Sequence, residues 1–464
     1  MILQKPLIRY ILEPVSRFMA RFSPKLKDTL FVLACLGIIL QFFGQGSGIA
    51  TYRYLIFFAV DCVFLGIMLL CSMKPDMQPV KFRVLPMLCW YGVGFMLLQS
   101  GLLLNMDYLP EAVMFLIAYP VVFLVWSNSD ASRIFRLLFT SMEISFVIYL
   151  AVSFLCFPMD EVRYSGLFNN LNGTAGYLAI AATCLLADCL LTEKFSVRWL
   201  LRLLLLGMCV SLLFYTSSRT GLLEIVMVAV VSVIVLLIRL WKQKKLFFFR
   251  NVLSVCLAVA LLFPTTISLF QLGRPVAEQG ERIIAQIIGS EDKAPGTKPK
   301  PPETDVITAE DSMNTTSARL VMDNRSFEQI TTGRSTIWIE YLKQLNLLGH
   351  SDGGHVTFCF IDQEMSINTA HMTILQFGYE NGIPAGLFYL AFNLIAGVYS
   401  VIHALRNKKD PWSMIPLMIT IAYGVHSLLA STAVSFWYMS TFLYYLVQFP
   451  LLVKKQPAKL SAEA

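Results

Sequence analysis

Charged residues are scarce in this chain of 464 residues. They make up 14% of it, whereas a soluble globular domain carries about a quarter. This scarcity, a hydrophobic fraction of 56% and a mean hydropathy of +0.64 exclude a water-soluble domain of this length. The net charge of +7 would suggest a nucleic-acid partner in a soluble protein. Here the basic residues form short clusters between apolar segments, so they indicate membrane topology and we expect no nucleic-acid partner.

The sequence also lacks the short motifs of several enzyme and transporter classes. It has no GxxxxGK[ST] phosphate loop, which disfavours ATP-driven transport by this chain alone. It has no DxD pair for a metal-bound sugar nucleotide and no CxxC or histidine-rich metal spacing. His350 and His355 have a spacing that suits a metal, but no third ligand accompanies them, and their glycine-rich surroundings favour a turn. We therefore expect neither a metal nor a cofactor.

A disulfide framework is not expected, although the chain has ten cysteines. Cys359 falls in a long polar loop and has no obvious partner there. The others behave as small buried hydrophobes within or at the ends of apolar segments. These are Cys35, Cys62, Cys71, Cys89, Cys156, Cys184, Cys189, Cys209 and Cys256.

What the sequence has in abundance is apolar segments of about 20 residues, the length that a helix needs to cross a bilayer core of about 30 Å. The period-2 alternation of a membrane β-barrel is absent. The sequence therefore predicts an all-α, polytopic membrane protein with about twelve transmembrane helices. The predicted spans are 28–44, 50–71, 84–104, 110–126, 134–157, 173–191, 199–216, 221–240, 251–271, 382–404, 412–430 and 434–453.

Basic clusters precede the first span and follow every even-numbered one, which places both termini in the cytoplasm by the positive-inside rule. The clusters are Lys5 to Lys27, Lys74 to Arg83, Arg133 and Arg136, Lys194 and Arg198, Arg239 to Arg250, Arg406 to Lys409, and Lys454 and Lys455. Residues 1–27 have no continuous apolar core before Thr29 and are interpreted as a cytoplasmic amphipathic segment. Helices 1–9 then occupy 28–271, helices 10–12 occupy 382–453, and 454–464 form a cytoplasmic tail.

One predicted external connection is long, the loop 272–381 between helices 9 and 10. Loops of this length are usually functional. Its segment 290–325, which begins with the Pro-rich stretch after Ala294, has the composition of a weakly ordered region. Ser326–Glu380 is predicted to fold, with an amphipathic helix just after Arg334. The apolar face of that helix consists of Ile337, Trp338, Tyr341, Leu342 and Leu345.

Three arginines are predicted on the external face, against the positive-inside bias. They are Arg163 in RYSGLFNN, Arg219 in SSRTG and Arg334 in TGRSTIW. The planar fork of arginine binds two phosphate oxygens at once, so these residues are candidate phosphate ligands. In the alternative interpretation Arg219 snorkels or pairs with Glu224, and Arg334 is a solvated loop residue.

His371 is the candidate for proton transfer. It lies in NTAHMTILQFGYENGIPAG, next to a transmembrane helix, and the ordinary histidine pKa of about 6.5 suits a general base at neutral pH. The alternative is an ordinary surface histidine.

Ionisable residues inside predicted spans support a different class, a secondary transporter or a flippase of lipid-linked sugars. They are Asp61, Glu143, Asp188, Arg202 and Glu224. Asp188 and Arg202 fall near the cytoplasmic ends of their helices, where they could snorkel. A transporter should also show internal repeats, and none is evident. A membrane scaffold without enzymatic activity is a third hypothesis.

Four stretches of the sequence resemble the bacterial O-antigen ligase and polysaccharide polymerase family of membrane glycosyltransferases. They are RYSGLFNNLNGTAGYLAI (163–180), SSRTGLLEI (217–225), TGRSTIWIEYLKQLNLLGHSDG (332–353) and AHMTILQFGYENGIPAGLFYL (370–390). They occur in the family's order, cover about a sixth of the chain, and the last two flank the end of the predicted loop.

The resemblance implies transfer of a glycan from an undecaprenyl-diphosphate carrier to an acceptor hydroxyl on the external face, without a metal or nucleotide. It implies that Arg219 and Arg334 hold the diphosphate and that His371 is the general base or positions the acceptor. It further implies substrate-binding roles, assigned to Arg163, Asn172, Trp338 and Glu380. The family usually has asparagine after the histidine, and this chain has Met372.

The sequence therefore leads us to expect a polymerase of surface polysaccharide in the bacterial inner membrane, with its active site on the outer face. A ligase that passes the glycan to a different acceptor is the alternative within the family. The expected partners are the lipid-linked oligosaccharide donor, the glycan acceptor and membrane lipids. A flippase and a chain-length regulator are further candidates.

Overall fold

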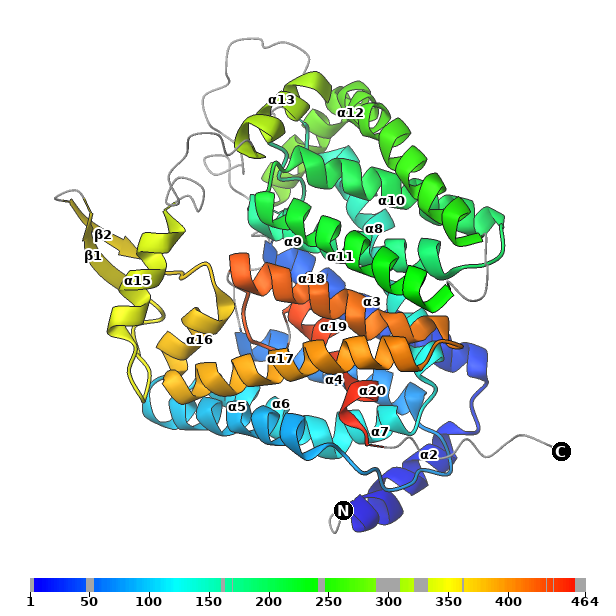
Figure 1. Cartoon of the computed structure of the whole chain (residues 1–464), viewed down its shortest axis with the longest axis vertical. Helices are drawn as coiled ribbons and strands as arrows, with labels where there is room; N and C mark the ends of the chain where they lie inside the picture. Colours follow the sequence, from blue (N-terminus) through cyan, green and yellow to red (C-terminus); the bar gives the residue numbers. More distant parts are fainter. Residues whose placement is uncertain are drawn as a thin grey trace. The chain divides into compact units, whose positions relative to one another are not determined.

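The structure is a computed structural model. It describes residues 4–46, 54–159, 163–168, 170–240, 247–288, 309–320, 333–360, 363–430, 432–436 and 438–454. In these ranges the secondary structure is helical apart from one two-stranded antiparallel hairpin and an isolated β-bridge between Phe82 and Val453 (Figure 1). Ten helices among the described residues are long and apolar enough to cross a membrane. The protein is therefore a multi-pass membrane protein with about ten apolar helices, and its predicted class is confirmed.

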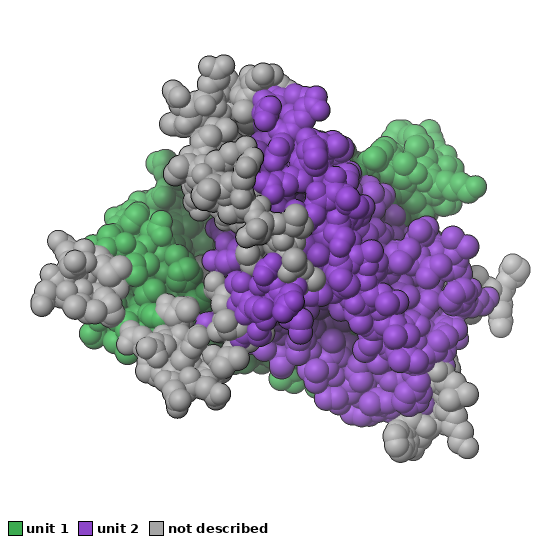
Figure 2. All heavy atoms as spheres, turned by 90° about the horizontal axis from the view of Figure 1, so that it is seen from above, with its two compact units in different colours: residues 1–38, 55–138, 325–464 green, residues 39–54, 139–324 purple. Residues whose placement is uncertain are grey.

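The chain divides into two compact units (Figure 2). Unit 1 comprises residues 1–38, 55–138 and 325–464, and unit 2 comprises residues 39–54 and 139–324. The residues of the predicted loop 272–381 are thus divided between the two units.

Unit 1 contains most of the helices from both ends of the chain. Trp90 on α5 is at the centre of its core, where the ring stacks on Phe115 at 4.5 Å and meets Phe123, Phe392 and Tyr445 edge-on. Its elements are α1 (Gln4–Leu7), η1 (Ile8–Leu12), α2 (Glu13–Met19), α3 (Pro24–Gly46, which continues into unit 2), α4 (Tyr54–Ser72), α5 (Val84–Leu103), α6 (Tyr108–Ile117), η2 (Ala118–Phe123), α7 (Leu124–Ser127), α15 (Arg334–Gln344), β1 (Val356–Phe360), β2 (Gln363–Ile367), α16 (Thr373–Asn381), α17 (Ile383–Arg406), η4 (Pro411–Met414), α18 (Ile415–Leu429), α19 (Met439–Val447) and α20 (Phe449–Leu452).

Unit 2 is built around α9, whose sequence is rich in alanine and leucine and is buried along almost its whole length. Helices α10, α11 and α12 pack against it. Asn170 caps α9 by accepting a hydrogen bond from the Asn172 amide, and Ser196 caps α10 in the same way. The elements are α8 (Ala131–Cys156, which begins in unit 1), α9 (Leu171–Leu191), α10 (Val197–Tyr215), α11 (Arg219–Leu240), α12 (Phe247–Ile288) and α13 (Ala309–Leu320).

The predicted twelfth span, 434–453, is not one helix. It consists of the short helices α19 and α20, and the described residues 432–436 before them are not helical. The buried carboxylate of Glu111 causes this difference, because it accepts hydrogen bonds from the Ser435 hydroxyl at 2.5 Å and the Phe436 amide at 2.9 Å. Nine residues of α19 rise only about 14 Å, too little to cross a bilayer.

The predicted ninth span, 251–271, is longer than expected. Helix α12 runs to Ile288, so the predicted loop begins as helix. The extension is amphipathic, with an i,i+4 ion pair between Arg274 and Glu278. It packs closely on α8, because a Cβ at Gly280 would meet the backbone of Leu155. Hydropathy located the end of the apolar segment near residue 271, but it could not show that the helix continues to Ile288, where it packs on α8.

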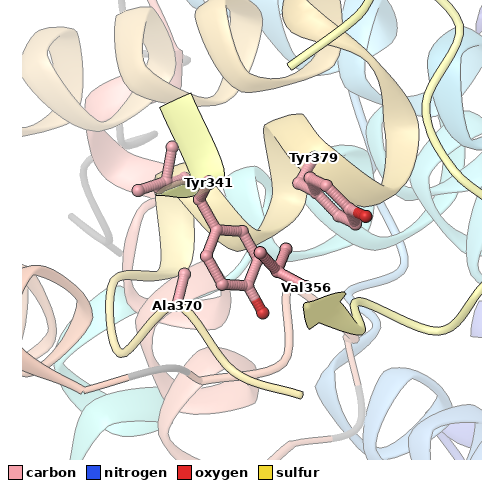
Figure 3. Packing of buried hydrophobic residues seen from close by; sticks show 5 residues of the cluster. Tyr341, Val356, Ala370 and Tyr379 are labelled. Atoms are coloured by element: carbon pink, nitrogen blue, oxygen red, sulfur yellow. The ribbon is translucent and has the colours of Figure 1, made fainter. Parts of the chain in front are cut away.

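The folded part of the predicted loop contains the expected helix, α15. Its buried Tyr341 belongs to a small hydrophobic core with Val356, Ala370, Leu375 and Tyr379 (Figure 3). The core residues come from α15, β1, α16 and, with Ala370, the segment just before α16, so this cluster holds the three elements together. Ile337, Trp338 and Leu345 pack against it, as predicted. Leu342 is exposed, so its predicted place on the buried face is wrong.

Parts of several predictions lie outside the described residues. Of the low-complexity segment 290–325, only α13 is described. The predicted tail 454–464 is described only at Lys454, and the side chain of Cys359 is not described.

Gly382 joins α16 to α17 with φ 93° and ψ 156°, a region that only glycine adopts readily. A Cβ there would also meet the carbonyl oxygen of Leu347. We expect Gly382→Ala to destabilise unit 1 by about 1–3 kcal/mol, measured as a lower midpoint of thermal unfolding in detergent. Gly397→Ala in α17 is the control, because a Cβ there meets nothing within 4 Å and no destabilisation is expected. Equal stability of the two variants would contradict the prediction.

Candidate functional site

Arg334 is the first residue of α15 and follows Gly333, which turns the chain with φ 78°. Its Nη1 donates a hydrogen bond to the carbonyl oxygen of Leu429, the last residue of α18. The carboxyl end of a helix carries partial negative charge, which stabilises a cation there. The guanidinium is thereby fixed at the end of a candidate membrane-spanning helix.

His371 lies just before α16, in the left-handed conformation with φ 51°. This conformation is uncommon for a residue other than glycine and often occurs at functional sites. Burial lowers the pKa of the imidazole, and the positive charge of Arg334 lowers it further. The structure therefore places these two predicted site residues within electrostatic reach of each other in unit 1. The imidazole is neutral at neutral pH, as a general base must be.

A chain of hydrogen bonds holds the backbone next to His371. The Ala370 amide donates to Oε1 of Gln376 at 2.6 Å, and Nε2 of Gln376 donates to Oε1 of Glu380 at 2.6 Å. The other carboxylate oxygen of Glu380 accepts from the Tyr108 hydroxyl at 3.2 Å. Burial raises the pKa of Glu380, while these two donors lower it. This chain of hydrogen bonds runs from Tyr108 on α6 to the Ala370 amide beside His371, and it occupies both carboxylate oxygens of Glu380. The role of Glu380 in substrate binding stays a prediction.

Gln376→Leu should lower the turnover number of the enzyme proposed below by about 10- to 100-fold, because it removes two of the three hydrogen bonds of this chain and frees the backbone next to His371. A displaced base lowers kcat more than it raises KM, so both constants should be measured on membrane-reconstituted protein. Glu340→Gln on the neighbouring α15 is the control, since its carboxylate pairs only with Lys343 among the described residues. An unchanged kcat in Gln376→Leu would show that this chain of hydrogen bonds does not position His371.

The other two histidines of this region have different surroundings. The His350 ring stacks on Tyr379 at 4.0 Å, and its Nε2 lies 2.8 Å from the Gln344 carbonyl oxygen. Burial raises the pKa of Tyr379, and its hydroxyl donates to Asp352 at 2.8 Å. His350 therefore has a packing role, and His355 is exposed.

Trp338, predicted to bind substrate, is half-buried one helical turn after Arg334. It packs against the cluster around Tyr341. Its substrate-binding role stays a prediction.

The remaining predicted site residues belong to unit 2. The Tyr164 amide donates to the Tyr215 carbonyl at 2.8 Å, which brings the segment after Arg163 beside the end of α10. A short turn with Ser217 in the left-handed conformation then leads to Arg219, the first residue of α11. Arg163 thus lies on a segment that adjoins the end of α10, from which a short turn leads to Arg219.

Asn172 occupies the first turn of α9, the helix that follows the Arg163 segment. The Thr174 hydroxyl in the same turn donates to the Ser165 carbonyl oxygen, so α9 starts against that segment. The Arg163 segment is therefore hydrogen-bonded both to the first turn of α9, which contains Asn172, and to the end of α10, which precedes Arg219. The start of α11 adds the positive end of a helix dipole, which favours an anion there.

Three of the ionisable residues in predicted spans form a network in unit 2. Arg202 on α10 pairs with Glu143 on α8 and lies 3.5 Å from Asp188 on α9. The Asp188 side chain is only 3% exposed, so Asp188 and Arg202 interact with each other inside the protein and do not extend toward the membrane surface as the sequence suggested. Removing one member of such a buried network typically destabilises a protein by about 3–5 kcal/mol. The network accounts for Glu143 without a transport role.

Sequence reasoning missed Glu111 and Gln376. Glu111 stood inside a predicted span, where a lone carboxylate signals a specific partner. Gln376 and Glu380 are four residues apart, a spacing that places them on one face of a helix. Comparison with protein-family models finds none that matches the chain, and no curated protein matches it significantly.

Proposed function

We propose that this protein is a membrane glycosyltransferase that joins lipid-linked oligosaccharide repeats into a surface polysaccharide. The observation that carries the proposal is that the cation Arg334 and the neutral base His371 lie within electrostatic reach of each other, so that the charge of Arg334 adds to the effect of burial in lowering the pKa of His371. Both lie outside the candidate spans, and Arg334 is bonded to the end of one of them. This is the place where a reactive group attached to a lipid would be presented.

Glycan transfer from a lipid diphosphate requires a base for the acceptor hydroxyl and a cation for the leaving diphosphate, and His371 and arginine supply these two functions. The imidazole of His371 takes the proton of the acceptor hydroxyl as its oxygen forms a bond to the anomeric carbon of the donor. The bond from that carbon to the phosphate oxygen breaks, and undecaprenyl diphosphate leaves with the electron pair. Arginine stabilises the charge that develops on the diphosphate, and such a donor typically contributes about 2.7–4 kcal/mol to the transition state.

The arginines of unit 2 form a second cationic site in this proposal. Arg219 at the start of α11 binds phosphate oxygens of a lipid-linked substrate, with Arg163 and Asn172 on the adjoining segments. Apolar helices accommodate the polyprenyl tail, and Trp338 and Glu380 contribute to glycan binding.

The acceptor distinguishes a polymerase from a ligase. We propose a lipid-linked repeat as the acceptor, so that the product is a long chain, on the outer face of the bacterial inner membrane. A flippase that delivers the repeats and a chain-length regulator are the partners that such an enzyme requires.

The test supplies the purified protein in lipid nanodiscs with undecaprenyl-diphosphate-linked repeats isolated from a deletion strain, in the presence of EDTA. The expected result is a ladder of longer glycans and released undecaprenyl diphosphate. Transfer of single blocks to an added second acceptor would replace the polymerase with a ligase. If no transfer occurs, and Asp61→Asn abolishes polysaccharide export in cells while His371→Ala does not, the transporter hypothesis is correct instead.

A further inference from the structure

The N-terminal helical segment, formed by α1, η1 and α2, ends only four residues before α3 begins at Pro24. One face of it packs into unit 1, where Ile8, Leu12 and Met19 are buried. Gln4 contributes a hydrogen bond to the same unit, because its side-chain oxygen accepts from the Val80 amide at 3.0 Å. The segment is therefore docked on the protein by one face, and the other faces are free to contact something else.

A second face exposes large apolar side chains. Tyr10 is 70% exposed, Ile11 57% and Phe18 55%, and Phe22 packs edge-on against Phe18 at 5.4 Å. Exposed apolar side chains also follow along α3, a candidate membrane span, at Leu26, Leu30 and Leu33. Because the exposed apolar face of this segment leads directly into a candidate membrane span, the occupant that fits it is the membrane itself.

The same segment is strongly basic. Six basic residues stand against the single acidic Glu13 in residues 1–27. Arg17 pairs with Glu13, and the Arg9 guanidinium lies over the Tyr10 ring at 5.6 Å. Helices with apolar and basic exposed faces lie in the plane of the interface and prefer anionic lipids. The basic residues are Lys5, Arg9, Arg17, Arg21, Lys25 and Lys27.

We propose that residues 4–22, helical as far as Met19 and followed by a short turn, lie in the plane of the membrane and bind an anionic phospholipid leaflet. Phe18, Phe22 and Ile11 enter the acyl boundary, and the arginines meet the phosphate groups of the lipids. The helix fixes the depth and tilt of α3 from the side on which the chain begins. This proposal does not depend on the catalytic one, since it concerns a different surface.

The test places an environment-sensitive fluorescent amino acid at position 18 of the full-length protein. Position 20, an exposed alanine on another side of the helix, is the matched control. The protein is reconstituted in nanodiscs of phosphatidylcholine alone or with phosphatidylglycerol, and quenching by lipids with a shallow nitroxide label is measured. We expect several-fold stronger quenching at 18 than at 20, increased by phosphatidylglycerol.

A charge-reversed variant, Arg9→Glu with Arg21→Glu, should lose the dependence on phosphatidylglycerol while the fluorophore at 18 still reports the depth of the helix. Equal quenching at 18 and 20 would overturn the proposed orientation. Quenching at 18 that is the same in both lipid compositions would overturn the requirement for anionic lipid. Both outcomes are measured on the otherwise native sequence, so they do not depend on the folding of the charge-reversed variant.

Discussion

His371→Ala is expected to reduce polymer formation by at least about 100-fold while the protein remains at normal levels in the membrane. General base catalysis by a positioned side chain contributes about 10²- to 10⁴-fold, and the imidazole supplies it in the proposed reaction. The measurement is the initial rate of glycan elongation in nanodiscs, together with an immunoblot of membranes from complemented cells. Lipid-linked single repeats should accumulate in those cells.

The pH dependence of the rate gives an independent test of the same residue. Burial and Arg334 lower the pKa of His371 below its ordinary value, so the neutral, active form persists to lower pH. The rate should be constant around neutral pH and should fall only on the acid side of about pH 6.5, as the imidazole becomes protonated. A rate that falls already above that pH would contradict a base with a lowered pKa.

His355→Ala is the matched control, because His355 is an exposed histidine in the same unit as His371. Its backbone carbonyl, which accepts a hydrogen bond from Tyr379, is retained in the variant. We expect its rate and pH profile to equal those of the unmodified protein. If His371→Ala were as active as His355→Ala, His371 would not be the base and the proposed site would be wrong.

Arg219→Ala is expected to lower the rate of elongation by about 10²- to 10³-fold, the typical effect of removing one donor to a developing negative charge. Arg219→Lys should recover only part of this loss, because an ammonium group keeps the charge but not the two-pronged geometry. The rates should be compared at saturating donor, so that a difference reports lost stabilisation of the transition state relative to the bound substrate and not merely weaker binding.

Arg274→Ala is the control for this arginine, since it lies in the same unit and its guanidinium pairs with Glu278 on the same helix. It should change the rate less than about threefold, as a partly exposed ion pair contributes little. Equal effects of the two alanine variants would indicate a general electrostatic influence of unit 2, and the proposed phosphate ligand would then be wrong.

Much of the fold was predictable because the membrane imposes a simple rule. A helix that crosses the hydrocarbon core must satisfy its own backbone and present apolar side chains, so length and hydropathy identify it directly. The amphipathic helix near Arg334 was predictable for a related reason, because Tyr341 and its partners recur with the helical period. The candidate residues Arg219, Arg334 and His371 were singled out by chemistry and by their resemblance to known motifs, and their proposed roles await the experiments above.

By itself, then, the sequence determined the membrane class, the positions of most spans and the helix α15, because these depend on local composition and period. Only the tertiary structure decided how the long-range polar contacts are made. Glu111 accepts hydrogen bonds from residues more than three hundred positions away, at the non-helical start of the predicted twelfth span. The Tyr108 hydroxyl donates to Glu380, which is also far away in the sequence, and this bond is part of the hydrogen-bond chain that holds the backbone beside His371. No local pattern encodes such a pair, because a buried carboxylate is satisfied by whichever donors the folded chain brings to it.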